Sequence, residues 1–139
     1  MKFKYFDHTA DVMFEGYGKS LEEGFENTAI AMFNLLTDIE KVKPLKEYKI
    51  EITADKLEKV LFDFLDELLF FLDTEHIIFS KFKNMKIEKK KELYTLKCTA
   101  LGDFAANYET HGDVKAPTYN EMSIKEEKGK FTIRAVVDI

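Results

Sequence analysis

The chain is poor in the residues that cross-link or loosen a protein. Its 139 residues include one cysteine, Cys98, so no disulfide can form within the chain, and a reducing cytosol is the expected environment. Two prolines and six glycines leave no room for a long flexible linker. We therefore expect a single domain over residues 1–139, with Cys98 as a small core residue.

Long uncharged apolar runs are also missing. The most apolar stretch, Leu57–Leu72, contains Glu58, Asp63 and Asp66, so it cannot span a lipid bilayer as a helix. The first residues alternate charged and aromatic side chains, and they lack the apolar segment of a secretion signal. The expected protein is soluble and cytoplasmic, without a membrane partner.

Positive charge is in short supply. The chain has 21 basic and 26 acidic residues, which gives a formal net charge of -5. A strong general affinity for nucleic-acid phosphates is therefore not expected, and any RNA would be held by a partner protein. The run Lys89–Glu92 has two interpretations, a basic RNA patch or a solvated turn, and its shortness favours the turn.

Sequence signatures of the common enzyme classes are absent. The chain has no glycine-rich phosphate loop, no paired-cysteine metal site and no HExxH motif. No serine or cysteine lies in a nucleophile elbow. Function must therefore be sought outside these classes.

Apolar residues, by contrast, are plentiful: 45% of the chain is hydrophobic, with 13 phenylalanines. Helical spacing of apolar residues predicts a first helix from Ser20, with Glu23 completing a capping box, to about Thr37. It predicts a second helix, capped by Asp55 and ending near Asp73, as the most buried one.

Alternating apolar and polar residues predict the strands. The predicted segments are 2–5, 12–18, 48–54, 77–82, 85–88, 93–101, 114–124 and 130–139, with two glycines closing the second. This order favours an α+β fold, a two-layer domain with two helices packed on one face of a mostly antiparallel sheet.

Acidic residues stand beside apolar, strand-like residues near both ends of the chain. Asp11 precedes one predicted strand, Asp138 ends another, and the α-carboxylate of Ile139 follows. If the two strands are neighbours, these anionic groups require a cation or a proton between them, and an all-oxygen set suits a hard cation such as Ca²⁺. The alternative is two solvated aspartates at strand ends.

Two histidines are candidate bases or ligands. His8 lies three residues before Asp11, and His111 lies four residues before Lys115 in a polar loop. Each can equally be a turn histidine that hydrogen-bonds the local backbone. His76 follows the second helix and is expected to favour the dipole at that helix's C-terminus.

Several stretches, in order and over the whole chain, resemble the archease family. They are FDHTADV at Phe6–Val12, the helix Leu57–Phe71, Gly102 before its polar loop, VKAPTY at Val114–Tyr119, and the final Val137–Ile139. The resemblance implies a small cytosolic α+β protein, itself no catalyst, that activates RtcB-type RNA ligases. It implies a role in tRNA splicing and RNA repair, through ligase guanylylation and multiple turnover.

The resemblance also implies a metal site at Asp11, Asp138 and the terminal Ile139, with Ca²⁺ as the expected ion and another divalent cation as the alternative. Asp7, His8, His111 and Lys115 are then candidate functional neighbours of this site. Pro117 departs from the family pattern, and a proline there suits an edge strand or bulge.

Two other classes of function stay open. One is a small metal-dependent phosphoester hydrolase that uses Asp11 and Asp138 around a cation, with His8 as the base. The other is a chaperone-like binding module, which would not depend on Asp11.

Overall fold

The computed structural model describes residues 1–6 and 11–139. Within them the chain forms seven β-strands and two α-helices. In chain order they are β1 (Phe3–Phe6), β2 (Asp11–Gly18), α1 (Leu21–Asn34), β3 (Lys46–Ala54), α2 (Leu57–Glu75), β4 (Ile77–Lys90), β5 (Leu93–Phe104), β6 (Ala116–Glu127) and β7 (Lys130–Asp138), with short 3-10 turns at Ile39–Lys41 and Ala105–Asn107.

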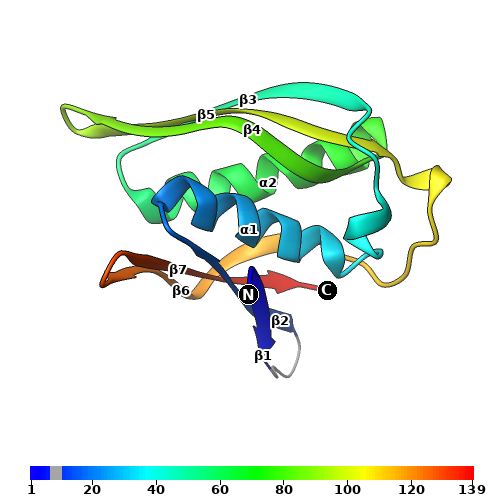
Figure 1. The fold of residues 1–139 in the computed structure, drawn as a ribbon, viewed down its shortest axis with the longest axis horizontal. Helices are drawn as coiled ribbons and strands as arrows, with labels where there is room; N and C mark the ends of the chain where they lie inside the picture. The colour runs from blue at the N-terminus through cyan, green and yellow to red at the C-terminus, as the bar shows by residue number, and fades with distance from the viewer. Residues whose placement is uncertain (7–10) are drawn as a thin grey trace.

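The strands form two sheets rather than the single sheet expected from the sequence. One sheet has four strands in the order β1-β2-β7-β6, and the other has three in the order β3-β5-β4. All strand pairings among the described residues are antiparallel, which confirms the α+β class. Figure 1 shows α1 and α2 between the two sheets, so the helices cover one face of each sheet. Strand periodicity alone does not tell which strands share a sheet.

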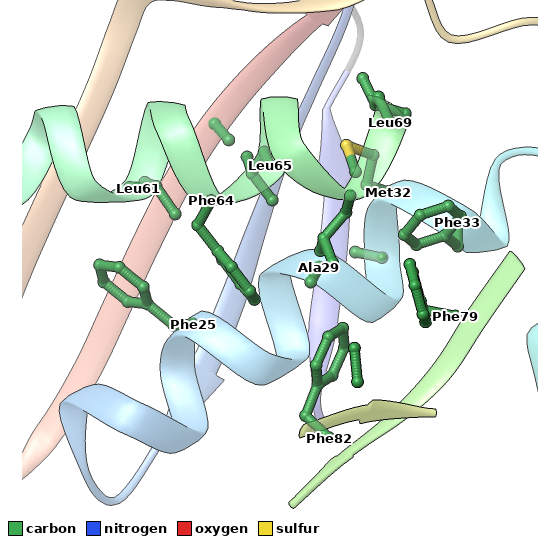
Figure 2. Close-up of a cluster of buried hydrophobic side chains, with 14 of the residues drawn as sticks. Phe25, Ala29, Met32, Phe33, Leu61, Phe64, Leu65, Leu69, Phe79 and Phe82 are labelled. Carbon is green, nitrogen blue, oxygen red and sulfur yellow. The ribbon is translucent and has the colours of Figure 1, made fainter. Parts of the chain in front are cut away.

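Aromatic rings from both helices and the three-stranded sheet fill the space between the layers (Figure 2). Phe25 of α1 stacks on Phe64 of α2, with ring centroids 6.4 Å apart, and Phe33 meets Phe79 of β4 edge-on. All four rings are fully buried. Because each ring removes a large apolar area from water, this cluster is the main stabilising feature of the domain.

Both helices begin and end close to their predicted positions, with differences at the caps. The Oγ of Ser20 accepts a hydrogen bond from the Glu23 amide, and Glu23 in turn accepts from the amide of Lys19. The prediction that Asp55 caps the second helix was wrong by one residue. The N-cap of α2 is Lys56, and its side chain makes no capping hydrogen bond. His76 ends α2 in a left-handed conformation, its amide donating to the Leu72 carbonyl.

The two glycines expected to close the second strand lie at its end, and Gly18 is its last residue, as predicted. Gly16 and Gly18 belong to β2, and a Cβ at either position would clash with the backbone of α1, at Thr28 and Gly24 respectively. Their role is therefore close approach of helix and strand. It is the absence of a side chain, rather than conformational freedom, that these positions require.

The segments expected as two strands at 77–82 and 85–88 form one long strand, β4, whose register shifts between Lys83 and Lys86. Asn84 adopts a positive φ of 56° at this irregularity. The predicted separator is thus a bulge and not a loop. A bulge changes which side chains face outward without breaking the strand, and sequence alternation cannot tell it from a turn.

Candidate functional site

Asp11 and Asp138 lie directly opposite each other on β2 and β7, which are neighbours in the four-stranded sheet. Residues directly opposite in an antiparallel pair project from the same face. The structure therefore brings together the two aspartates that the sequence singled out, which we call the acidic pair. At a cross-strand position, two like charges are destabilising unless another group joins them.

Strand alternation explains which face of the sheet carries the acidic pair. Phe14, Ile133 and Ala135 are fully buried on the helix-facing side. Asp11 and Asp138 are an odd number of residues away from these positions, so they project from the opposite face. The site thus lies outside the core, where side chains can change with little effect on packing.

The same outer face also carries a pair of opposite charges, Glu15 and Arg134, which stabilises the sheet. Four residues along β2 from the acidic pair, Glu15 lies opposite Arg134 of β7. Arg134 donates two hydrogen bonds to one Glu15 oxygen, at 2.9 and 3.0 Å. The Tyr17 hydroxyl donates to the other oxygen of Glu15, and burial first, with this bond next, raises the pKa of Tyr17 to about 12. Opposite charges thus face each other at the Glu15–Arg134 position, while like charges face each other at the acidic pair. The contrast favours a functional origin for the pair.

The two members of the acidic pair differ in exposure. Asp138 is exposed, whereas Asp11 is half-buried and its Oδ1 is shielded from solvent. One carboxylate therefore sits in a less polar setting beside a second that reaches water. This arrangement fits a cation that enters from the solvent side.

A hard cation needs more oxygen atoms than the acidic pair provides. Among residues 1–6 and 11–139, no group of three or more His, Cys, Asp or Glu side chains could hold a metal ion. Ca²⁺ takes six to eight oxygen ligands, which include backbone carbonyls and water. The pair fits the anionic part of such a site, and the exposed Ile139 follows Asp138 directly.

Lys115 lies beside the acidic pair through its backbone. Its amide donates a 2.8 Å hydrogen bond to the carbonyl of Asp138, and Ala116 is the cross-strand partner of Asp138 on β6. The Lys115 side chain is exposed. Pro117 lies in β6 at the edge of the sheet, where a missing amide donor is tolerated.

The other candidate neighbours are placed differently. His111 is exposed, and its amide donates to the carbonyl of Leu36, just beyond α1. This bond joins the backbone of two segments that are distant in the sequence, so the role of the His111 side chain stays a prediction. Asp7 and His8 lie outside the described residues.

Sequence reasoning missed Asp103, which organises the loop leading to His111 and Lys115. This buried carboxylate accepts hydrogen bonds from the Tyr108 hydroxyl at 2.7 Å and from the Phe104 amide at 2.8 Å. The bond from Tyr108 is the largest cause that lowers the pKa of Asp103 below its ordinary value. An aspartate followed by Asn and Tyr four and five residues later was the available signal.

A groove beside α1 does not contain the acidic pair. This groove of about 1170 Å³ is lined by residues that include Asn27, Ile30, Asn34 and Phe82, and neither Asp11 nor Asp138 lines it. Half-burial and two neighbouring glutamates raise the pKa of Glu26 there. Because the acidic pair lies outside this groove, the groove does not serve as a substrate pocket for a hydrolase built on those two aspartates.

A small α+β domain with an acidic pair on an outer sheet face is the class that the fold and the site define. The chain matches the Archease protein family over residues 3–139. It is 44% identical to the archease of Methanothermobacter thermautotrophicus over 138 residues, covering 99% of this chain and 98% of that protein. It is 38% identical to the archease of Pyrococcus abyssi, covering 99% of both chains. This chain therefore belongs to the archease family.

Solved structures agree with this assignment. The solution structure of Methanobacterium thermoautotrophicum protein 1598 matches with a TM-score of 0.86 and 43% identity, covering 99% of both chains. The crystal structure of a Thermotoga maritima archease, described as a possible chaperone, matches with a TM-score of 0.58. At 19% identity, with 98% of this chain and 96% of that chain covered, the second match shows the fold alone.

No helix among the described residues is both long and apolar enough to cross a membrane.

Proposed function

We propose that this protein activates an RtcB-type RNA ligase by presenting a metal-binding acidic site to it. The observation that carries the proposal is the direct cross-strand pairing of Asp11 with Asp138. The ligase as partner is what the resemblance described above implies, and membership of the archease family supports it. The proposed role is promotion of ligase guanylylation and multiple turnover in tRNA splicing and RNA repair.

Asp11, Asp138 and the α-carboxylate of Ile139 would hold the ion, with Ca²⁺ as the first candidate. A bound cation would neutralise the anionic groups and join them in one fixed arrangement. The sheet holds the two aspartates in register, and the hydrogen bond from the Lys115 amide fixes the carbonyl of Asp138. Lys115 and His111 lie on the segment that leads into β6, and we propose that this segment contacts the ligase.

A guanylylation assay tests the proposal. Purified protein, with Ca²⁺ and an RtcB-type ligase from a related organism, should speed single-turnover guanylylation of the ligase by GTP. Asp11→Asn and Asp138→Asn should each abolish that effect. Glu126→Gln on the same sheet, which removes one exposed carboxylate away from the acidic pair, should leave it unchanged. Full activation by both aspartate variants would refute the role of the pair.

A chaperone-like binding module is the second candidate, favoured by the description of the Thermotoga maritima relative. A chaperone would suppress aggregation of several unrelated unfolded proteins, and its action would not depend on Asp11. Light scattering of heat-denatured citrate synthase, with the wild-type protein and with Asp11→Asn, separates the two. Equal suppression by both forms, together with no effect on guanylylation, would favour the chaperone.

A further inference from the structure

The outer face of the three-stranded sheet is positively charged although the whole chain is acidic. Both helices lie on the other side of this sheet, and Figure 1 shows no described element covering its outer face. The cross-strand register places six lysines on that face against three glutamates and the buried Asp103, an excess of two positive charges in a chain of net charge -5. We call the six lysines the lysine face: Lys49, Lys81, Lys83, Lys86, Lys90 and Lys97.

Two features of the register show that stability does not account for this face. Lys86 lies directly opposite Lys97, a like-charge pair that destabilises a sheet. Lys86 reaches the outer face because of the bulge after Lys83, which shifts the alternation and turns Ile87 toward the core. A regular strand would instead have placed Ile87 outward.

The centre of the lysine face is hollowed. A depression of about 350 Å³ lies beside the bulge, and its polar lining consists of Lys49, Asn84, Lys97 and Thr99 together with one carboxylate, Glu51, the partner of Lys97. Ammonium, amide and hydroxyl groups are donors that contact phosphate oxygens in nucleic-acid complexes. The depression thus offers several donors to one anionic group.

Glutamates on the same face do not neutralise it. Lys83 contacts Glu47 at 2.8 Å and Lys97 contacts Glu51 at 3.7 Å, with roughly half or more of each side chain exposed. Exposed pairs of this kind contribute little to stability, so a phosphate can replace the glutamate as the lysine's partner. The paired lysines therefore remain available to an anionic ligand.

We propose that the lysine face binds the phosphate backbone of an RNA strand, weakly and without sequence preference, with one phosphate in the depression. RNA is favoured over an acidic protein because lysine is depleted from protein interfaces, which need apolar or aromatic anchors. The face carries threonines between its lysines, and no aromatic residue occupies the outward register positions of β3, β4 and β5. Without stacking platforms, binding depends on phosphate contacts alone.

This inference stands apart from the proposed ligase activation, and either can fail without the other. It is also compatible with the expectation from net charge, which argues against strong binding only. The lysine face and the acidic pair belong to different sheets. RNA bound at the first would therefore leave the second accessible.

Fluorescence anisotropy with a labelled oligouridylate of about 20 nucleotides, titrated at several salt concentrations, tests the proposal. The wild-type protein should bind at low salt and lose affinity as salt rises. The double variant Lys49→Glu with Lys97→Glu should bind RNA at least about tenfold more weakly. The slope of log K against the logarithm of the salt concentration should be smaller in magnitude by roughly one or more. The matched control, Lys125→Glu with Lys128→Glu, makes the same change in net charge away from the lysine face and should lose far less.

Three results would overturn the proposal: no wild-type binding at low salt, equal loss in the control variant, or binding of an oligoglutamate peptide as tight as that of RNA. Circular dichroism checks the fold of each variant. If the double glutamate variant unfolds, the double glutamine variant, Lys49→Gln with Lys97→Gln, is titrated in its place. Lys86→Glu adds an independent readout. It relieves the like-charge pair with Lys97, so its melting temperature should stay equal or rise while RNA affinity falls.

Discussion

At the scale of single residues, two aspartates of this protein serve opposite purposes. Asp103 is buried and satisfied by Tyr108 and the Phe104 amide, so its charge helps to order a loop. Asp11 faces another aspartate across a strand pair, an arrangement of like charges that a bound cation would stabilise. The first is therefore expected to contribute to folding and the second to function.

Asp11→Asn tests the functional assignment. Without divalent cations the variant should melt at the same temperature as the wild type or higher, because one of two opposed charges is gone. Ca²⁺ should stabilise the wild type in thermal melts and should not stabilise the variant, since ligand binding raises apparent stability only where a site exists. A large loss of stability in the cation-free variant would make Asp11 a structural residue.

Asp103 predicts a defined pH dependence. Its folded-state pKa is lowered, chiefly by the Tyr108 hydroxyl, so its stabilising contribution is present above the ordinary aspartate value, about 3.9, and is lost as pH falls through the folded pKa. Tyr108→Phe removes the largest cause and should raise the pKa of Asp103, as followed by carboxyl carbon NMR. Tyr5→Phe is the control: it removes a hydroxyl bonded to Ala31 and should leave that titration in place. The same titration midpoint in Tyr108→Phe and the wild type would contradict the assignment.

At the scale of elements, α2 shows how one helix is divided between core and surface. Leu61 and Leu68 are fully buried between the sheets, whereas Phe70 is 57% exposed. Phe62 covers Tyr119 of β6, with the rings stacked 4.3 Å apart. The apolar arc of this helix therefore contacts several layers. The prediction that α2 is the most buried helix was wrong, because eight of the 14 residues of α1 are buried and only six of the 19 residues of α2.

Leu61→Ala or Leu68→Ala should each lower the free energy of unfolding by ~2–5 kcal/mol, because a buried leucine leaves a cavity. Phe70→Ala, at an exposed position of the same helix, should change it by less than about 1 kcal/mol. Urea denaturation of the three variants measures both effects. Unchanged stability with lost ligase binding in the leucine variants would instead identify α2 as an interface.

At the scale of the whole molecule, the pairing of β2 with β7 brings residues from the two ends of the sequence into one site (Figure 1). The acidic pair therefore forms only when β2 pairs with β7. Any change at the end of β7 acts on the site directly, while the core residues of that strand remain in place.

A tag fused after Ile139 should test this arrangement. It converts the α-carboxylate into a neutral amide carbonyl and adds bulk next to Asp138. We expect an unchanged circular dichroism spectrum, because Ile133, Ala135 and Val137 still face the core, but weaker Ca²⁺ binding and weaker ligase activation. A tag before Met1 is the control and should be harmless. Equal calcium titrations and equal guanylylation rates for both tagged forms would exclude the α-carboxylate as a ligand.

The sequence by itself determined the α+β class, both helices and most strands, because apolar periodicity and capping residues such as Ser20 act locally. It also singled out Asp11 and Asp138, since acidic residues beside apolar strand ends are visible without a fold. Element ends were less certain: the cap at Lys56 and the bulge after Lys83 depend on packing and register.

Only the tertiary structure decided how the strands divide into two sheets, because residue alternation specifies a buried face and not the neighbour on either side. It decided that Gly16 and Gly18 serve helix contact, since a missing side chain has meaning only when α1 lies against it. It placed Asp103 within reach of Tyr108 and gathered six lysines on one outer face. The sheet order and the lysine face arise from contacts between strands that are distant in the sequence, and the glycine contacts arise from packing of α1 on β2. The contact of Asp103 with Tyr108 is local, but only the structure shows that it forms.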